Sequence, residues 1–168
     1  MGSVTFPHRR AAASAGFTLV EILVVIAIVA IAVALASANF GDDGRRVTER
    51  EAKRLAGALE HAAALAQWQR ATIGVSSEGN VYRFWSRDAS DRWVAISGDD
   101  VLVPHALPAG LNVSASRYAG APVAPNAILP LRPSGRNEPY ELVLSSAALT
   151  VIVSSDPLNR VAIAALAP

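Results

Sequence analysis

The residue with the clearest chemical role is Glu21, because it is the one ionisable side chain in a long apolar run. Residues 17–38 read FTLVEILVVIAIVAIAVALASA, in which the other polar residues are Thr18 and Ser37. A carboxylate inside a lipid-embedded helix costs on the order of 2–3 kcal/mol. Either Glu21 lies near the interface and reaches water, or it pairs with a cation in the membrane. The run contains no basic residue, so the cation would be a free amine made by cleavage before Phe17.

Catalytic patterns are missing from the rest of the sequence. The segment Gly74-Val75-Ser76-Ser77-Glu78-Gly79 misses the G-x-S-x-G nucleophile elbow by one residue. The chain has no cysteine, which excludes disulfides, thiolate metal sites and cysteine nucleophiles. None of the three histidines has the spacing of a metal site such as H-E-x-x-H. We therefore expect no enzyme activity and no cofactor; the histidines are His8, His61 and His105.

Two acidic groups, Asp88 with Asp91 and Asp99 with Asp100, are candidate calcium ligands. Neither has the D-x-[DN]-x-[DN]-G-x₅-E spacing of an EF-hand. Aspartate side chains also accept hydrogen bonds from nearby backbone amides in turns. The sequence therefore favours turn chemistry at both places, and we expect no metal site.

The overall charge argues against a nucleic-acid-binding protein that works by bulk attraction. The chain has 168 residues with 15 basic and 14 acidic side chains, a formal charge of +1. Basic residues between 45 and 54 alternate with acids, which favours a solvated helix face over a surface for lipid head groups or DNA. The net charge would not reveal a local basic patch that could bind DNA, such as one formed by Arg132, Arg136 and Arg160.

The apolar run is long enough to cross a membrane. As a helix, residues 17–38 would extend about 33 Å, compared with a hydrocarbon core of about 30 Å. A cleaved secretory signal would have a shorter apolar region, although Ala34-Leu35-Ala36 and Ala36-Ser37-Ala38 resemble its cleavage site. A plain signal anchor explains the length of the run but not Glu21. Arg9 and Arg10 before the run favour a cytoplasmic N-terminus, but the arginines beyond it leave charge counting alone undecided.

The remaining chain predicts one helix followed by strands. The cluster Gly41-Asp42-Asp43-Gly44 predicts a break or hinge over residues 39–47. Thr48-Glu49-Arg50-Glu51 resembles a capping box that begins a new helix. This helix runs to about Arg70 with an apolar core stripe of Leu55, Leu59, Ala62, Ala63 and Ala66. Short β-branched runs then predict strands at residues 73–75, 81–85, 93–96, 111–116, 128–131, 141–145, 149–154 and 160–166.

Further expectations concern packing in this part of the chain. Val81, Phe84, Trp85 and Trp93 are expected among the core residues. Residues 118–126, which contain Pro122 and Pro125, are expected to form an exposed connection. The chain is thus divided into a leader (1–16), a membrane helix (17–38), a connection (39–47) and a globular domain (48–168).

The segment Gly16-Phe17-Thr18-Leu19-Val20-Glu21 resembles the prepilin processing motif of type IV pilins and type II secretion pseudopilins. The resemblance implies that a prepilin peptidase cuts between Gly16 and Phe17 and N-methylates Phe17. It also implies that Glu21 attracts the amine of a neighbouring subunit during assembly. Cleavage would remove two of the 15 basic residues, leaving 13 against 14 acidic residues and a charge of −1.

The globular part resembles the H-type minor pseudopilins of type II secretion systems. The similar segments are residues 50–55, 69–74, 81–84, 107–108, 128–131 and 156–161, together with Trp93. The family often has Gly where Asn159 stands, and a Phe-Pro-Asp-Gly style run is commoner there at 128–131. The implied fold is α+β and pilin-like, with a long N-terminal helix packed on an antiparallel β-sheet head of two-sheet sandwich character.

This resemblance implies an assembly function. The chain would be a single-pass protein of the bacterial inner membrane, with a cytoplasmic N-terminus before cleavage and a periplasmic head. It would join other pseudopilins near the tip of the pseudopilus that exports folded proteins across the outer membrane. Its partners would be those pseudopilins, the peptidase, the inner-membrane assembly platform and the lipid bilayer. A minor pilin of a type IV pilus, acting in assembly or DNA uptake, is the alternative.

Overall fold

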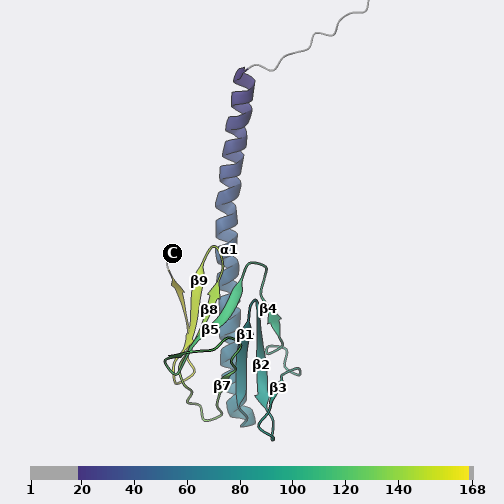
Figure 1. Ribbon diagram of the computed structural model, residues 1–168, viewed down its shortest axis with the longest axis vertical. Helices are drawn as coiled ribbons and strands as arrows, with labels where there is room; N and C mark the ends of the chain where they lie inside the picture. The colour runs from purple at the N-terminus through teal and green to yellow at the C-terminus, as the bar shows by residue number, and fades with distance from the viewer. Residues whose placement is uncertain (1–18, 167–168) are drawn as a thin grey trace, which may run out of the picture. The chain divides into compact units, whose positions relative to one another are not determined.

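The computed structural model describes residues 19–166, and the side chains of residues 36–42 lie outside the description. The chain forms two compact units, divided between Asn39 and Phe40. The first unit contains the start of helix α1 (Leu19–Gln69). The second contains the remainder of α1 and all the strands, and Figure 1 shows these strands gathered alongside the C-terminal part of the helix.

A break over residues 39–47 is wrong, because all of them are helical within α1, while a hinge there stays a prediction. The expected capping box is also wrong, since Thr48 lies inside the helix and is fully buried. Its hydroxyl donates to the carbonyl oxygen of Gly44, four residues back, at 2.9 Å and lies 3.0 Å from the hydroxyl oxygen of Ser146. A β-carbon added to Gly44 would lie 3.2 Å from that of Ala148. Gly44 therefore permits a close approach between the helix and residues 146–149, at the usual cost of a helical glycine.

The strands form two antiparallel five-stranded sheets. Sheet A has the order β3-β2-β1-β7, with β4 also paired to β2, and sheet B has the order β10-β9-β8-β5-β6. The strands are β1 (Ile73–Glu78), β2 (Val81–Arg87), β3 (Trp93–Ala95), β4 (His105–Ala106), β5 (Asn112–Tyr118), β6 (Ala121–Pro122), β7 (Leu129–Leu131), β8 (Tyr140–Ser145), β9 (Thr150–Ser155) and β10 (Val161–Leu166).

All eight predicted strands are confirmed to within a few residues. The sequence missed β4 and β6, which have two residues each and so show no alternating pattern. β6 falls in the expected exposed connection, and both of its residues are exposed.

One hydrophobic core joins α1 to both sheets. The predicted helical stripe is confirmed, because all five of its residues are buried. Four of them, Leu55, Leu59, Ala62 and Ala66, pack in one cluster with residues of β1, β2, β5, β7, β8 and β9. Phe84 is buried as expected, whereas Val81, Trp85 and Trp93 are only half-buried. Tyr82 and Tyr140, which the sequence did not single out, are also in this core, and burial raises the pKa of each to about 12.

Gly74 in β1 has a packing role that the sequence did not reveal. A β-carbon at this position would overlap Cγ2 of Ile128 and lie 2.8 Å from Cζ3 of Trp93. The glycine therefore lets both side chains cross the face of β1.

We expect Gly74→Ala to lower the free energy of unfolding by about 1–3 kcal/mol, because Ile128 and Trp93 must shift. Urea unfolding of the full chain in detergent measures this change. Gly57→Ala is the matched control: Gly57 is exposed within α1, and an added β-carbon would meet no atom within 4 Å. This control should gain about 0.5–1 kcal/mol through helix propensity. Equal effects of the two changes would contradict the packing role.

Candidate functional site

The residues of the proposed processing site lie mostly outside the described part of the chain. Gly16 and Phe17 precede it, so their cleavage and methylation remain predictions. Glu21 lies in the first turn of α1 and is exposed. Its role in assembly also remains a prediction.

The N-terminal part of α1 exposes apolar side chains around the whole helix. Its large apolar residues between 19 and 35 are all exposed, from 47% for Ile22 to 82% for Leu19. Full burial of such a side chain is worth about 1.5–3 kcal/mol. This surface therefore provides a large driving force for contact with an apolar environment.

Within the residues that the structure describes, no helix meets the length and apolarity needed to cross a membrane.

Two histidine–carboxylate pairs fasten β4 and the segment before it to α1. Nε2 of His61 lies 2.8 Å from Oδ2 of Asp99, and Nε2 of His105 lies 2.8 Å from Oε2 of Glu51. The second pair is the more buried, with side-chain exposures of 17% and 16%. The sequence assigned Glu51 to the capping box and had no signal for its real partner, which is 54 residues away.

The expected turn chemistry of the aspartates is confirmed. One carboxylate oxygen of Asp99 accepts the amides of Val101 and Leu102, at 2.8 and 3.1 Å. Asp88 likewise accepts the amides of Ser90 and Arg92, both at 2.9 Å. The hydrogen bond from His61 is the largest factor that holds the pKa of Asp99 below its ordinary value, against a smaller opposing effect of desolvation.

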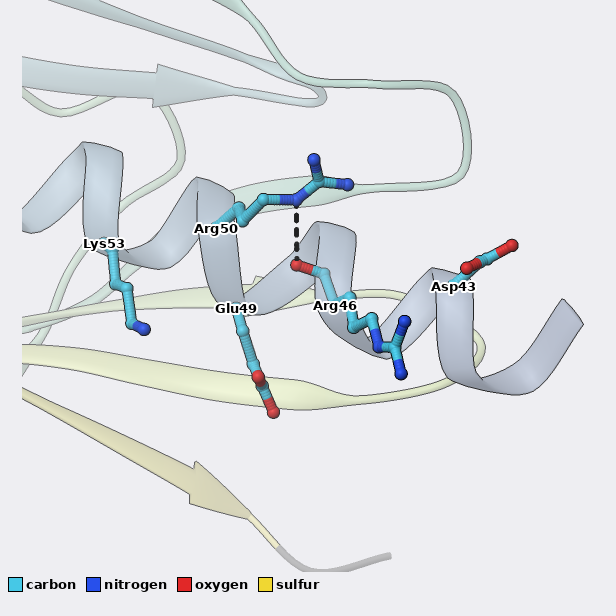
Figure 2. A pocket seen from close by; sticks show the side chains of 5 residues that line it. All are labelled: Asp43, Arg46, Glu49, Arg50 and Lys53. Atoms are coloured by element: carbon cyan, nitrogen blue, oxygen red, sulfur yellow. Dashed lines mark hydrogen bonds between the residues drawn. The ribbon is translucent and has the colours of Figure 1, made fainter. Parts of the chain in front are cut away.

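A shallow hollow beside the middle of α1 is lined by both acidic and basic side chains. Figure 2 shows its five side chains, in which Glu49 and Lys53 project to the same side of the helix. Nε of Arg50 donates to the carbonyl oxygen of Arg46 at 3.3 Å, and Arg45 pairs with Glu49 at 3.1 Å. This arrangement agrees with the predicted solvated face; the lining residues are Asp43, Arg46, Glu49, Arg50 and Lys53.

The two serines near the G-x-S-x-G-like segment have structural partners. The hydroxyl oxygen of Ser76 accepts the indole N–H of Trp85 at 2.8 Å. The hydroxyl oxygen of Ser77 accepts the backbone amide of Ala115 at 2.9 Å, which joins the two sheets. His61 and His105 are bonded to carboxylates elsewhere, so neither serine is placed as part of a nucleophile–base pair with them.

The candidate basic patch is partly neutralised by an acid. Nε of Arg160 donates to Oδ2 of Asp156 at 2.7 Å, while Arg132 and Arg136 are exposed. Asn159, which replaces the glycine common in the resembling family, has a φ of 62°. Glycine and asparagine tolerate this left-handed conformation best, which explains why either residue fits the turn.

The closing turn is fixed from both sides by asparagine side chains. The amide nitrogen of Asn137, a buried residue, donates to the side-chain oxygen of Asn159 at 2.7 Å. The amide nitrogen of Asn159 in turn donates to the carbonyl oxygen of Gly135 at 3.2 Å. The turn after β9 is thereby joined to the turn before β8.

Comparison with known proteins identifies the family. Residues 12–37 match the Prokaryotic N-terminal methylation motif, and residues 51–156 match the family described as Type II transport protein GspH. This chain belongs to the GspH family. The match confirms the predicted resemblance to H-type pseudopilins and favours type II secretion over the type IV pilus alternative.

A curated relative agrees with this assignment. Type II secretion system protein H of Aeromonas hydrophila is 33% identical over 101 residues, which are 59% of this chain and 55% of that protein. The chain thus spans about half the length of the curated relative it matches.

Two structures of the minor pseudopilin EpsH from the type II secretion system of Vibrio cholerae share the fold. They have TM-scores of 0.56 and 0.58 at 18% and 17% identity, covering 72% and 73% of this chain and 97% and 95% of theirs. The solution structure of E. coli GspH gives 0.50 at 19% identity, covering 70% of this chain and 88% of that one. These likenesses confirm the predicted α+β, pilin-like fold.

The Asp99 site predicts a specific dependence of stability on pH. The folded-state pKa of Asp99 lies below its ordinary value of 3.8, so its ionised form stabilises the fold. This contribution is fully present above pH 3.8 and is lost as the pH falls through the lower folded-state pKa. Urea unfolding of wild-type chain and Asp99→Asn should therefore differ above this range and converge below it.

Asp100→Asn is the control, because Asp100 is the next residue and is exposed. It should change the pH dependence little. If Asp100→Asn removes as much of the acid sensitivity as Asp99→Asn, the role given to the His61 contact is wrong.

Proposed function

We propose that the GspH-family chain described above is a minor pseudopilin of a type II secretion system. It joins other pseudopilins at or near the tip of the pseudopilus that drives export of folded proteins across the outer membrane. The observation that carries this proposal is the match to two families in the expected order, the methylation motif at 12–37 and the GspH family at 51–156. The minor pseudopilin structures of similar fold support it.

Maturation of the chain begins at its N-terminus. A prepilin peptidase cuts between Gly16 and Phe17 and methylates Phe17, while Arg9 and Arg10 keep the leader in the cytoplasm. Glycine is needed at position 16 because the peptidase approaches the backbone closely there. The inner-membrane assembly platform then receives the mature subunit.

Residues 17–38 anchor the subunit in the inner membrane, with the head in the periplasm. The exposed apolar side chains from Leu19 to Leu35 support this role, because lipid or neighbouring helices would cover them. Glu21 faces the same surroundings, where its carboxylate attracts the Phe17 amine of an adjacent subunit. In a low dielectric such a pair strongly favours one register of packing, even where its net stabilisation is small.

The head works as a rigid structural part and performs no bond chemistry. Its core joins α1 to both sheets, and Thr48, His61 and Glu51 connect the helix to surrounding segments. A force or contact applied to the head is therefore transmitted to α1.

We expect Gly16→Ala to leave the precursor uncut, and a strain that relies on this variant to accumulate exoproteins in the periplasm. N-terminal sequencing and a secretion assay measure the two effects. The unchanged chain should restore secretion to a strain that lacks it. An N-terminus at Phe17 in the variant would contradict the predicted role of Gly16 in cleavage. A failure of the unchanged chain to restore secretion would contradict the pseudopilin function.

We expect Glu21→Val to be inserted and cut normally but to be lost from the pseudopilus, because the packing register is no longer selected. Glu21→Asp keeps the charge and should retain much of the assembly. Fractionation of sheared pseudopili and the secretion assay measure both variants. Wild-type secretion by Glu21→Val would argue against the register role.

A further inference from the structure

Strand β10 presents an unusual edge at the end of sheet B. It pairs with β9 on one side, and the strand order places it at the end of the sheet in the described part of the chain. Its register with β9 is unbroken from Val161 opposite Ser155 to Leu166 opposite Thr150. Six residues of strand extend about 20 Å.

The other edges of the described sheets are short. In sheet A, β3 and β7 have three residues each and β4 has two, and β7 contains Pro130. In sheet B the opposite edge is β6, which has two residues including Pro122. Short strands and prolines are common means of protecting an edge from further pairing. β10 has neither proline nor a charged residue, and no bulge interrupts its pairing with β9.

The backbone of β10 offers hydrogen-bonding groups along its outer side. The amide of Asp156 donates to the carbonyl of Arg160 at 3.1 Å, so these two opposite residues form a hydrogen-bonded pair just before β10 begins. In an antiparallel pair every second residue bonds to the neighbouring strand. Ala162, Ala164 and Leu166 therefore bond to β9, and the N–H and C=O groups of Val161, Ile163 and Ala165 point outward.

The side chains of β10 are apolar and exposed on both faces of the sheet. Ile163 shares a face with Val153, a core residue, yet it is 43% exposed, and Leu166 on the other face is 47% exposed. Alanines separate these two large residues along the strand. A neighbouring strand with small or branched apolar side chains would fit between them, whereas a charged strand would lose its hydration there.

We propose that the outer edge of β10 receives an extended, uncharged segment of a different pseudopilin subunit, which adds to sheet B as a further strand. This inference rests on the proposed function for the identity of the neighbour. Strand addition supplies affinity through main-chain hydrogen bonds and specificity through alternate side chains. If copies of this chain all pointed in one direction, they would meet through two different surfaces, so β10 of one copy would have to pair with a different edge of the next. The terminal strands that a copy would offer are two or three residues long, and the part of β5 beyond β6 already uses the amides of Val113 and Ala115 for hydrogen bonds to Gly79 and Ser77. The added strand therefore comes from another subunit.

The chain contains no cysteine, so one introduced thiol gives a unique cross-linking position. Full-length Ala164→Cys is expressed in cells with the complete secretion system and treated with a bismaleimide. We expect a cross-link to another pseudopilin, located on one segment by mass spectrometry. Ser90→Cys is also exposed but lies between β2 and β3 of sheet A, and it is the matched position expected to give little of this product.

Edge variants test the mode of contact. Ala165→Pro removes an outward N–H that β9 does not use, and it should lower the yield of the Ala164→Cys cross-link by about tenfold. Ala165→Thr keeps the N–H and should retain the yield. Ala165→Lys adds the charge that natural edges carry and should act like the proline, and thermal unfolding shows that each variant keeps its fold.

The outcomes separate this proposal from the proposed function. If the chain restores secretion but Ala165→Pro and Ala165→Lys leave the cross-link unchanged, the edge contact is wrong and the pseudopilin function stands. A product formed with a second copy of this chain would overturn the choice of a different subunit. If the unchanged chain fails to restore secretion, the pseudopilin function is wrong, and so is the identification of the neighbour as another pseudopilin.

Discussion

The packing of α1 against both sheets is the interaction on which the rest of the head depends. Leu55 and Leu59 are fully buried, and alanines at positions 52, 62 and 66 let the strands approach the helix closely. Each sheet packs an apolar face into this core, and exposing that face to water would cost much of the free energy that holds the sheet together. The helix therefore supplies the surface that both sheets share.

The same helix has to satisfy two environments with different sequence patterns. Between residues 19 and 35 it is apolar all around, whereas from residue 43 onward charged residues alternate with the buried stripe. The first pattern suits lipid or other helices, and the second suits a helix with one covered face. This change of pattern, rather than a break in the backbone, marks the transition along α1, since residues 39–47 remain helical.

Polar contacts then fix the irregular segments on this framework. The Thr48–Ser146 contact holds the turn between β8 and β9, and the two histidine–carboxylate pairs hold β4 and the segment before it. Asn137 and Asn159 connect two further turns. With these segments held, the edge of β10 is the longest unprotected strand edge of the described sheets, which makes it the natural place for an added strand.

The sequence alone determined the features that repeat over short distances. The stripe from Leu55 to Ala66 and the eight strands follow from helical and alternating periodicity, and the processing motif is a contiguous string from Gly16 to Glu21. Only the tertiary structure decided the roles of Gly44, Thr48 and Glu51. Their local signals indicated a helix break and a helix N-cap. Contacts with Ala148, Ser146 and His105 instead stabilise a continuous helix. These partners are 54 to 104 residues distant, so no local pattern could reveal them.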